Sequence, residues 1–396
     1  MTTHLKNLKE KIGQQIDESK SLYIETSHQI HARPEIGNEE FFASQTLSGI
    51  LEKAGFEVTR NVAGHETGFV ARKTSSKSGP KIGYLAEYDA LPGLGHACGH
   101  NLIGTISTAA AIALASTLEE TGGEVFVFGT PAEEGGTNGS AKGSFAKHGL
   151  FEGIDAALMI HPSGDTRLTS SALAVDPLDF HFYGKSAHAA GAPEKGINAL
   201  DAVILLFNGI SALRQQLPSH VRIHGIIPNG GDAPNIIPEY ASARFYIRST
   251  TWAETEEVSN KIRRIAEGAA LATGSTVKIE RFQNEVKDII INRTLDEIVG
   301  KELEQLGEVL IHEERGGIGS TDAGNVSHVI PTTHEYIKIG PSELVAHTPE
   351  FREAAASARG DEALIIAAKA LAYAGLQLLE NPELLARVKE DFDRTH

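Results

Sequence analysis

Hydrophobic and polar positions follow two different rhythms along this chain of 396 residues. Leu5, Leu8, Ile12 and Ile16 recur at helical spacing, which predicts an amphipathic first helix. A second helix is expected at 39–54, and short apolar runs follow it. In order, the pattern then predicts strands at 56–60, 68–72 and 82–86, a helix at about 101–118, and strands at 124–129 and 156–160. Such alternation is typical of an α/β architecture, with a mixed, mainly parallel sheet and helices on both faces.

The segment 177–287 has a pattern of its own. It predicts, in order, a strand at 178–183, a helix at 197–217, strands at 221–227 and 240–248, a helix at 253–273 and a strand at 276–282. The order βαββαβ is that of a ferredoxin-like α+β domain. We therefore interpret 177–287 as an inserted domain, so that 1–176 and 288–396 together form the domain around it. A chain of this length is also expected to form two domains.

The composition is that of a globular protein, with 41% hydrophobic and 22% charged residues. The formal net charge of -16 argues against binding to nucleic acid or to an anionic membrane, and it mildly favours cationic or neutral small substrates. The single cysteine cannot form an internal disulfide. The uncharged run 102–118 is short for a membrane span and is expected to be a buried helix. Because the first helix has no signal-peptide pattern, we expect a cytoplasmic protein.

Candidate chemistry is concentrated at the ends of three predicted strands. The single cysteine, Cys98, and His100 follow the strand at 82–86, Glu133 and Glu134 follow the next strand, and His161 follows the strand at 156–160. A lone cysteine is usually a small buried hydrophobe, and a lone histidine usually has a structural role. Ligands, however, collect beyond the carboxyl ends of the strands in open α/β sheets. Thiolate, imidazole and carboxylate groups meeting there predict a metal site.

Motifs for other chemistries are absent from the sequence. None of the His-Glu pairs continues as H-E-x-x-H, and there is no G-x-S-x-G nucleophile elbow. The glycine pairs lack the third glycine of a dinucleotide-binding loop, and no phosphate-binding P-loop occurs. A redox function of Cys98 would need a second cysteine to resolve it. Metal-assisted hydrolysis remains.

Six motifs carry a resemblance to a known family, and they occur in that family's order. They are Asp89-Ala90-Leu91-Pro92, His96-Ala97-Cys98-Gly99-His100, Pro131-Ala132-Glu133-Glu134, Ser186-Ala187-His188-Ala189, Pro234-Asn235-Ile236-Ile237-Pro238 and Ala346-His347-Thr348-Pro349-Glu350-Phe351. With them the chain resembles the dinuclear metal amidohydrolases and peptidases that include aminoacylase, carboxypeptidase G and the indole-acetyl-amino-acid hydrolases. The stretches 87–93 and 229–231 are similar to the subgroup of the Xaa-Arg dipeptidase type and the aminobenzoyl-glutamate hydrolases.

The resemblance implies a site for two divalent ions in each chain. Its ligands would be Cys98, His100, Glu134, His161 and His347. This mixture of donors suits Zn²⁺ first and Mn²⁺ second, and which ligand bridges the two ions stays open. Glu87 stands where the aminoacylase branch has a histidine, so we do not count it as a ligand. Asp89 is expected behind the ligands, holding a histidine ring.

The resemblance also implies roles for residues that do not bind metal. Glu133 would be the general base toward a metal-activated water. His188 would polarise the scissile carbonyl, often in the partner subunit's site, although a loop histidine can also be a plain surface residue. Asn235 and Arg248 would hold the substrate carboxylate, unless Arg248 forms a structural ion pair. Gly317 would line the same pocket.

Together these observations predict a metal-dependent amide hydrolase. The resemblance implies that its substrate is a dipeptide or an N-acyl or aminoacyl amino acid with a free carboxylate. It also implies that the inserted domain acts as a lid and joins two chains in a homodimer. Neither nucleic acid nor a membrane is expected as a partner. The alternative is a catalytically inactive binding protein on the same fold.

Overall fold

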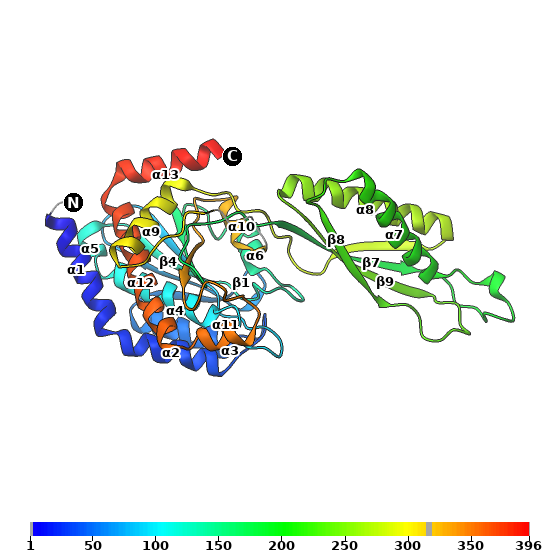
Figure 1. Ribbon diagram of the computed structural model, residues 1–396, viewed down its shortest axis with the longest axis horizontal. Helices are drawn as coiled ribbons and strands as arrows, with labels where there is room; N and C mark the ends of the chain where they lie inside the picture. The colour runs from blue at the N-terminus through cyan, green and yellow to red at the C-terminus, as the bar shows by residue number, and fades with distance from the viewer. Residues whose placement is uncertain (1–2, 314–318, 396) are drawn as a thin grey trace. The chain divides into compact units, whose positions relative to one another are not determined.

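The computed structural model describes residues 3–313 and 319–395, and the chain divides into two compact units. Unit 1 comprises Met1–Ser171, Ile289–Gly317 and Asp322–His396. Unit 2 comprises Ala172–Asp288 and Ile318–Thr321. Both are drawn in Figure 1, with the element labels used below. Gly317, predicted to line the substrate pocket, lies outside the described residues.

Unit 1 is a mixed α/β layer structure. Its strands are β1 (Glu57–Val62), β2 (His65–Thr74), β3 (Lys81–Ala86), β4 (Glu124–Gly129), β5 (Ala156–Leu158), β6 (Ile160–Ser163) and β11 (Glu335–Lys338). Its helices are α1 (Thr3–Glu18), α2 (Lys20–Ala32), α3 (Phe41–Lys53), α4 (His100–Ala115), α5 (Leu118–Thr121), α6 (Ala141–Lys147), α9 (Arg293–Gln305), α10 (Ala323–Ser327), α11 (Pro349–Ala354), α12 (Ala358–Glu380) and α13 (Pro382–Thr395). The main sheet has the order β1-β2-β4-β3-β5. Pairing is antiparallel in β1-β2-β4 and parallel in β4-β3-β5, and β6 pairs in parallel with β11.

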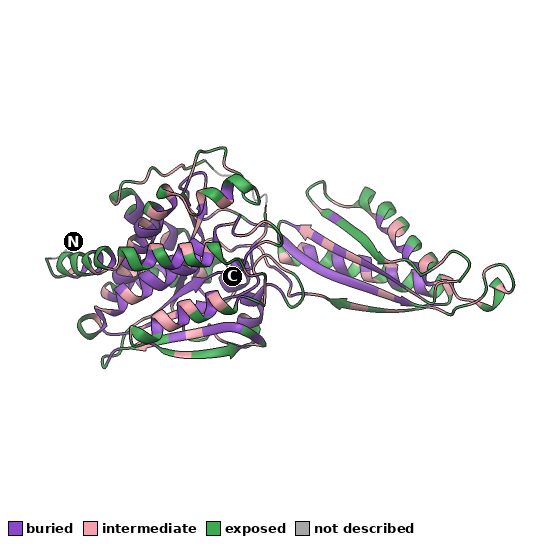
Figure 2. Cartoon of the chain, turned by 90° about the horizontal axis from the view of Figure 1, so that it is seen from below, coloured by how far each residue is buried: buried purple, intermediate pink, exposed green. Residues whose placement is uncertain are grey.

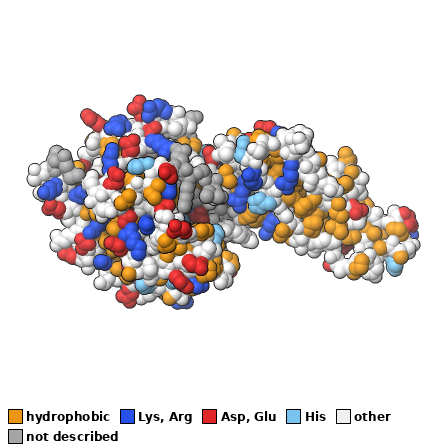
Figure 3. All heavy atoms as spheres, viewed as in Figure 1, with side chains coloured by type: hydrophobic (Ala, Val, Ile, Leu, Met, Phe, Trp, Pro, Cys, Tyr) orange, Lys and Arg blue, Asp and Glu red, His pale blue; other side chains and the backbone are white. Residues whose placement is uncertain are grey.

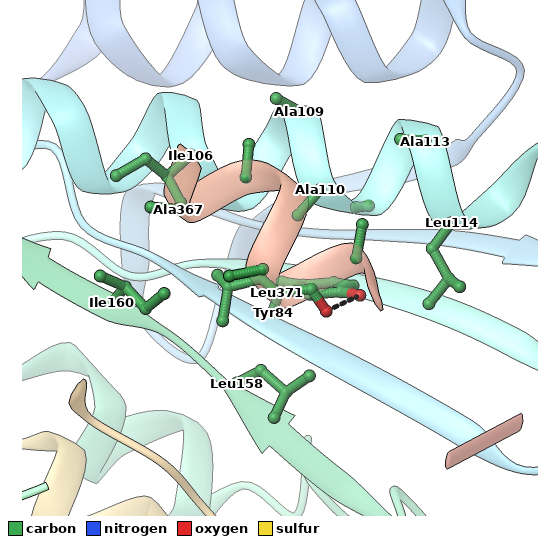
Figure 4. Close-up of a cluster of buried hydrophobic side chains, with 14 of the residues drawn as sticks. Tyr84, Ile106, Ala109, Ala110, Ala113, Leu114, Leu158, Ile160, Ala367 and Leu371 are labelled. Carbon is green, nitrogen blue, oxygen red and sulfur yellow. Dashed lines mark hydrogen bonds between the residues drawn. The ribbon is translucent and has the colours of Figure 1, made fainter. Parts of the chain in front are cut away.

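Helices cover both faces of the unit 1 sheet. Successive side chains of a strand point to opposite faces, and because consecutive residues of β3 are apolar, both faces need a covering layer. Ile82 and Tyr84 of β3 pack with α4 and α12, and the hydroxyl of Tyr84 donates a hydrogen bond of 3.2 Å to the carbonyl of Leu371 (Figure 4). Leu85, the next residue, joins the cluster on the other face with Phe145 of α6. This two-sided burial confirms the predicted α/β architecture and leaves the strand ends free for a site.

The helix α12 of unit 1 is long and apolar enough to cross a membrane by length and composition alone. Within the fold 78% of its apolar window is buried. It packs against α4, which is itself the buried helix expected near 102–118. Both helices therefore belong to the core of unit 1.

Unit 2 confirms the predicted βαββαβ order. Its elements are β7 (Ala174–Tyr183), α7 (Ala199–Leu213), β8 (Arg222–Asn229), β9 (Tyr240–Ser249), α8 (Trp252–Thr273) and β10 (Thr276–Arg281). The sheet has the order β10-β7-β9-β8 with antiparallel pairing throughout, and its apolar residues pack under α7 and α8. Figure 2 shows the inner strands buried, whereas β8 at the edge is largely exposed.

The predicted strand at 156–160 requires a correction. It breaks at Met159 into β5 and β6, which belong to different sheets. His161 therefore lies inside β6, paired with Tyr336 of β11, and does not follow a strand end. The apolar run is continuous through Met159, so no polar or turn residue marks the break in the sequence.

Candidate metal centre

All five residues predicted to bind metal are gathered in unit 1. Cys98 lies in the turn just before α4, and His100 is the first residue of that helix. Glu134 lies in the loop after β4, His161 lies in β6, and His347 lies just before α11. Their donor atoms form two sets, and within each set all atoms lie within 4.8 Å of one another. The first set is Cys98, His100 and His161, and the second is Cys98, Glu134 and His347. Cys98 belongs to both sets.

Short distances support both sets. Sγ of Cys98 lies 3.5 Å from Nε2 of His161, and Oε2 of Glu134 lies 3.3 Å from Nε2 of His347. A third group of donor atoms, from Glu87, His100 and Glu133, meets the same 4.8 Å criterion. Glu87 was not predicted to be a ligand, yet the fold places its carboxylate at the centre.

Hydrogen bonds fix the orientation of two imidazole rings of the candidate centre, those of the buried His100 and the half-buried His161. Nδ1 of His100 lies 2.9 Å from Oδ1 of Asp89, and Oδ2 of Asp89 accepts a 3.0 Å bond from the backbone N–H of Glu134. Nδ1 of His161 lies 2.7 Å from the carbonyl of Pro162, to which it can donate. In both rings Nδ1 is therefore occupied, and Nε2 faces the other candidate ligands and is available to bind a metal.

The backbone around the ligands is held in unusual conformations. Gly99 has φ of +77°, and a Cβ at this position would lie 2.4 Å from Cγ of Pro162, so the tight turn between Cys98 and His100 requires glycine. Ala132, just before the two glutamates, and His347 also have positive φ, at 56° and 65°. The backbone N–H of His347 donates a 2.9 Å bond to the carbonyl of Ala97. Strained residues of this kind persist where the surrounding fold fixes them, often at functional sites.

The electrostatics of the centre suit cation binding. Burial lowers the pKa of His161 to about 4, so its ring is neutral and can coordinate. Burial also raises the pKa of the Cys98 thiol, so its thiolate needs a cation beside it. Burial and the carboxylates of Glu87 and Asp322 raise the pKa of Glu133 well above its ordinary value. Several buried nitrogen and oxygen atoms have no hydrogen-bond partner among the described residues, and Nε2 of His100 is one of them. Buried nitrogen and oxygen atoms without such a partner fit a divalent ion such as Zn²⁺.

Sequence reasoning missed three buried residues beside these ligands. Lys142 of α6 forms ion pairs with Glu87 and Asp322, and all three side chains are fully buried. The ring of His334 stacks on that of His161 with centroids 5.4 Å apart. No local sequence motif identifies Lys142, Asp322 or His334, because each contacts the candidate centre through a residue that is distant in sequence. A lysine just after the Gly-rich loop at 135–139 was the best available signal.

The predicted catalytic residue His188 and the predicted substrate-binding residue Asn235 lie together in unit 2. The loop of His188 pairs with the loop of Asn235, since the N–H of Ala189 donates a 3.0 Å bond to the carbonyl of Asn235. Nδ1 of His188 accepts bonds from the N–H groups of Ala190 and Gly191, at 3.2 and 3.0 Å. The proton of the neutral ring is therefore on Nε2, which is exposed and can donate to a carbonyl oxygen.

Arg248 lies at the opposite end of the unit 2 sheet. It sits near the end of β9 across from Val175, whereas the His188 loop follows Tyr183, across from Tyr240 at the start of β9. Nη1 of Arg248 donates a 3.0 Å bond to Ser320. Within the described part of the chain its guanidinium forms no ion pair with a carboxylate, so the structural ion pair considered from sequence is not seen there.

Comparison with known proteins gives one family description and several relatives. The description "Peptidase dimerisation domain" matches residues 178–273. The chain is 38% identical to the Xaa-Arg dipeptidase of Mus musculus over 98% of this chain and 93% of that protein. It is 37% identical to one of the polypeptides of the p-aminobenzoyl-glutamate hydrolase of Escherichia coli, over 75% of this chain and 65% of that polypeptide.

Solved structures share the fold at lower identity. The aminobenzoyl-glutamate utilization protein of Klebsiella pneumoniae superposes with a TM-score of 0.71 at 17% identity, covering 93% of this chain and 98% of that one. A dinuclear metal binding peptidase of the M20 family from Bacillus subtilis has a TM-score of 0.65 at 21% identity, covering 92% and 99%. With the dipeptidase relative matched over nearly its whole length, the chain belongs to the M20 family of metal-dependent peptidases and amidohydrolases.

Proposed function

We propose that this protein hydrolyses the amide bond of a dipeptide, or of an N-acyl or aminoacyl amino acid, that carries a free carboxylate. The observation that carries the proposal is the pair of donor sets that share Cys98 and lie beside Glu133. The names of the two relatives, a dipeptidase and an aminobenzoyl-glutamate hydrolase, fit this substrate class. The net charge of -16 favours a basic C-terminal residue over an acidic one.

The two donor sets would each hold one divalent ion, Zn²⁺ in the first instance and Mn²⁺ as the alternative. Cys98, His100 and His161 would hold one ion, and Cys98, Glu134 and His347 the other. When bound, such ions lower the pKa of a coordinated water toward about 7 and polarise a carbonyl. Asp89 would keep the His100 ring and the Glu134 backbone in register through its two oxygens.

Glu133 would carry the proton transfers. Its carboxylate takes a proton from the attacking water and later delivers it to the nitrogen of the leaving amine. Its side chain is 11% exposed, so it is shielded from bulk water but can still be reached. Burial and the neighbouring carboxylates raise the pKa of Glu133 and favour its protonated form, which supports the return of the proton to the leaving group.

Residues of unit 2 would hold the substrate's carboxylate and its carbonyl. The guanidinium of Arg248, with no carboxylate partner among the described residues, is suited to bind a substrate carboxylate with two parallel hydrogen bonds. His188 would donate from Nε2 to the developing oxyanion, with Asn235 beside it. From Val175 to Tyr183, strand β7 separates Arg248 from the His188 loop by eight residues, or about 27 Å. One substrate of dipeptide size therefore cannot contact both in a single chain, which favours His188 acting in the partner subunit's site.

A homodimer formed through unit 2 fits the exposed surface of that unit. Strand β8 is a sheet edge with unpaired backbone groups, and Ile226 and Ile227 on it are 62% and 43% exposed. Ile204 and Leu205 of α7 are 45% and 41% exposed. Hydrophobic side chains gather over unit 2 on the face shown in Figure 3. An apolar edge of this kind is a natural interface for a second copy, and it lies within the residues matched as a dimerisation domain.

The proposal is tested with protein reconstituted with Zn²⁺ or Mn²⁺ and offered a panel of substrates. The panel holds dipeptides with C-terminal Lys, Arg or ornithine, N-acetyl amino acids and aminobenzoyl-glutamate. We expect turnover of the basic dipeptides above that of the other classes, and no turnover after chelation. Binding of the ions without turnover of any panel member would favour the inactive binding protein instead.

A further inference from the structure

One ammonium group is buried beside the candidate metal centre without being part of either donor set. Lys142 lies in α6, and its side chain has no exposed surface. Nζ lies 2.6 Å from Oε1 of Glu87 and 2.5 Å from Oδ1 of Asp322. The backbone N–H of Lys142 also donates a 3.0 Å bond to Oδ2 of Asp322. Both ends of this lysine are thus fixed by Asp322, and the ammonium joins two carboxylates from different loops.

A buried ammonium is expensive unless its charge is compensated, so its position needs an explanation. Burial alone would lower the pKa of Lys142, but the carboxylates of Asp322 and Glu87 raise it, and the group stays charged. Two carboxylates around one ammonium leave an excess of one negative charge. The group formed by Lys142, Glu87 and Asp322 therefore has a net charge of -1, which adds to the negative potential at the candidate metal centre.

Glu87 connects this ammonium to the ligands. Its Oε1 faces Lys142, while its other oxygen, Oε2, lies 3.4 Å from Nε2 of His100. That nitrogen is the one left free for an ion, because Nδ1 of His100 pairs with Asp89. The same nitrogen lies 3.9 Å from Oε2 of Glu133, the candidate base. The orientation of the Glu87 carboxylate thus sets the position of its Oε2 relative to Nε2 of His100 and to the carboxylate of Glu133.

We propose that Lys142 is a positioning residue of the metal centre. By binding Oε1 of Glu87, it fixes the Glu87 carboxylate beside His100 and Glu133. This inference rests on the proposed metal centre. Without Lys142, Glu87 can turn its carboxylate fully toward His100 and Glu133, where it would compete for the ion or repel the base. The ammonium thus prevents Glu87 from acting as a free carboxylate ligand, and Asp322 holds the ammonium in place.

The test uses the Lys142→Met variant of the full chain, with Co²⁺ as the metal probe. Absorption bands of bound Co²⁺ report the ligands around the ion, and a competition titration gives its affinity, so neither readout depends on the substrate. We expect about a 10- to 100-fold change in affinity for one of the two ions and altered Co²⁺ bands, with a loss of kcat of the same order. Asp322→Asn, which loosens Lys142 without removing it, should change the same readouts less. If Lys142→Met does not fold, Asp322→Asn carries the test alone.

Two further variants separate positioning from plain destabilisation. Lys9→Met removes an ion pair to the buried Glu302, in the helical layer of α1 and α9. It should lower Tm and leave the Co²⁺ bands unchanged. In the double variant Glu87→Gln/Lys142→Met, the effects on affinity should not add, because Lys142 acts through Glu87. Fully additive effects, or a Lys142→Met protein with unchanged affinities and bands but a lower Tm, would overturn the proposal. If the unsubstituted protein binds no Co²⁺, the metal centre itself is refuted.

Discussion

Buried carboxylates occur in both units, but their charges are balanced in different ways. In unit 2, Asp176 of β7 is fully buried, with Nε of Arg281 at 2.6 Å and Nη2 of Arg263 at 3.3 Å. In unit 1, four acidic side chains gather around the candidate metal centre, and Lys142 is the buried ammonium beside them. They are Glu87, Asp89, Glu133 and Glu134.

The difference distinguishes a structural ion pair from the candidate metal centre. Around Asp176 two guanidinium groups satisfy both oxygens, so the site is complete with protein atoms alone. At the candidate metal centre several buried nitrogen and oxygen atoms have no hydrogen-bond partner among the described residues. Buried polar atoms without a partner are costly in a fold unless a bound group such as a cation completes them. The way in which buried charges find partners therefore distinguishes the candidate metal centre from an ion pair that is complete within the chain.

The largest expected effect comes from Glu133→Gln, which removes the proposed base and keeps the shape of its side chain. Because Glu133 belongs to neither of the two sets that share Cys98, both ions should stay bound. Without a proton acceptor, kcat should fall by about 10²- to 10⁴-fold. Steady-state kinetics gives kcat and elemental analysis of the same preparation gives the metal content, with Glu10→Gln on the exposed face of α1 as control. Turnover near that of the unsubstituted protein would remove Glu133 from the mechanism.

Cys98→Ala should reduce the metal content itself. Both donor sets contain this sulfur, so its loss weakens the binding of both ions and leaves fewer than two per chain. Elemental analysis after gel filtration in buffer without metal gives the stoichiometry. The variant also loses the only thiol of the chain, so a thiol reagent gives an independent check of the change. Two ions per chain, retained with unchanged affinity, would contradict a thiolate ligand.

His188→Ala tests the part that unit 2 plays in the chemistry. Removal of one donor to a developing oxyanion is expected to lower kcat by about 10²-fold, with both ions still bound. Dimers that mix His188→Ala chains with Glu133→Gln chains distinguish the two arrangements. They should recover activity if His188 serves the partner's site, since one of the two sites then has both residues. Mixed dimers as inactive as either parent would assign His188 to its own chain.

A substitution of Asp176, whose charge is balanced by two arginines, should lower stability without changing metal binding. Asp176→Asn leaves two guanidinium groups without their carboxylate, and we expect a loss of about 3 kcal/mol in the free energy of unfolding of unit 2. This is the lower end of the range for buried pairs, because Arg281 and Arg263 remain 34% and 26% exposed. Urea unfolding can be followed by the fluorescence of Trp252, the single tryptophan, which lies under the guanidinium of Arg281. A fall in metal content in this variant would break the distinction between the two kinds of charge.

The sequence predicted the order of the elements, and it named candidate ligands that the fold gathers, but it did not predict how the buried charges are balanced. Helical and strand rhythms indicated the βαββαβ order of unit 2, and the motifs around Cys98, Glu134 and His347 named side chains that the fold brings together. Lys142 and Asp322 were not found, because an ion pair between residues 180 positions apart leaves no local pattern. The break at Met159 was missed for a related reason, since an apolar run does not say which sheet each half joins.

At a third buried site the carboxylates are neutralised by a proton, and a substitution there should have the smallest effect on stability. Asp296 and Glu335 are fully buried in unit 1, and Asp296 accepts a 2.6 Å bond from the hydroxyl of Thr169. Burial raises the pKa of both carboxyl groups, that of Asp296 to about 7, so a proton removes the charge here. In the unfolded chain both titrate near about 4. The folded state therefore binds more protons than the unfolded state between about pH 4 and 7, and stability falls as the pH rises through this window. Glu335→Gln should reduce that fall in stability by about 1 kcal/mol, measured by urea unfolding of chelated protein so that metal release does not contribute. An unchanged slope would mean that the pair is held by cations, like Asp176, and not by a proton.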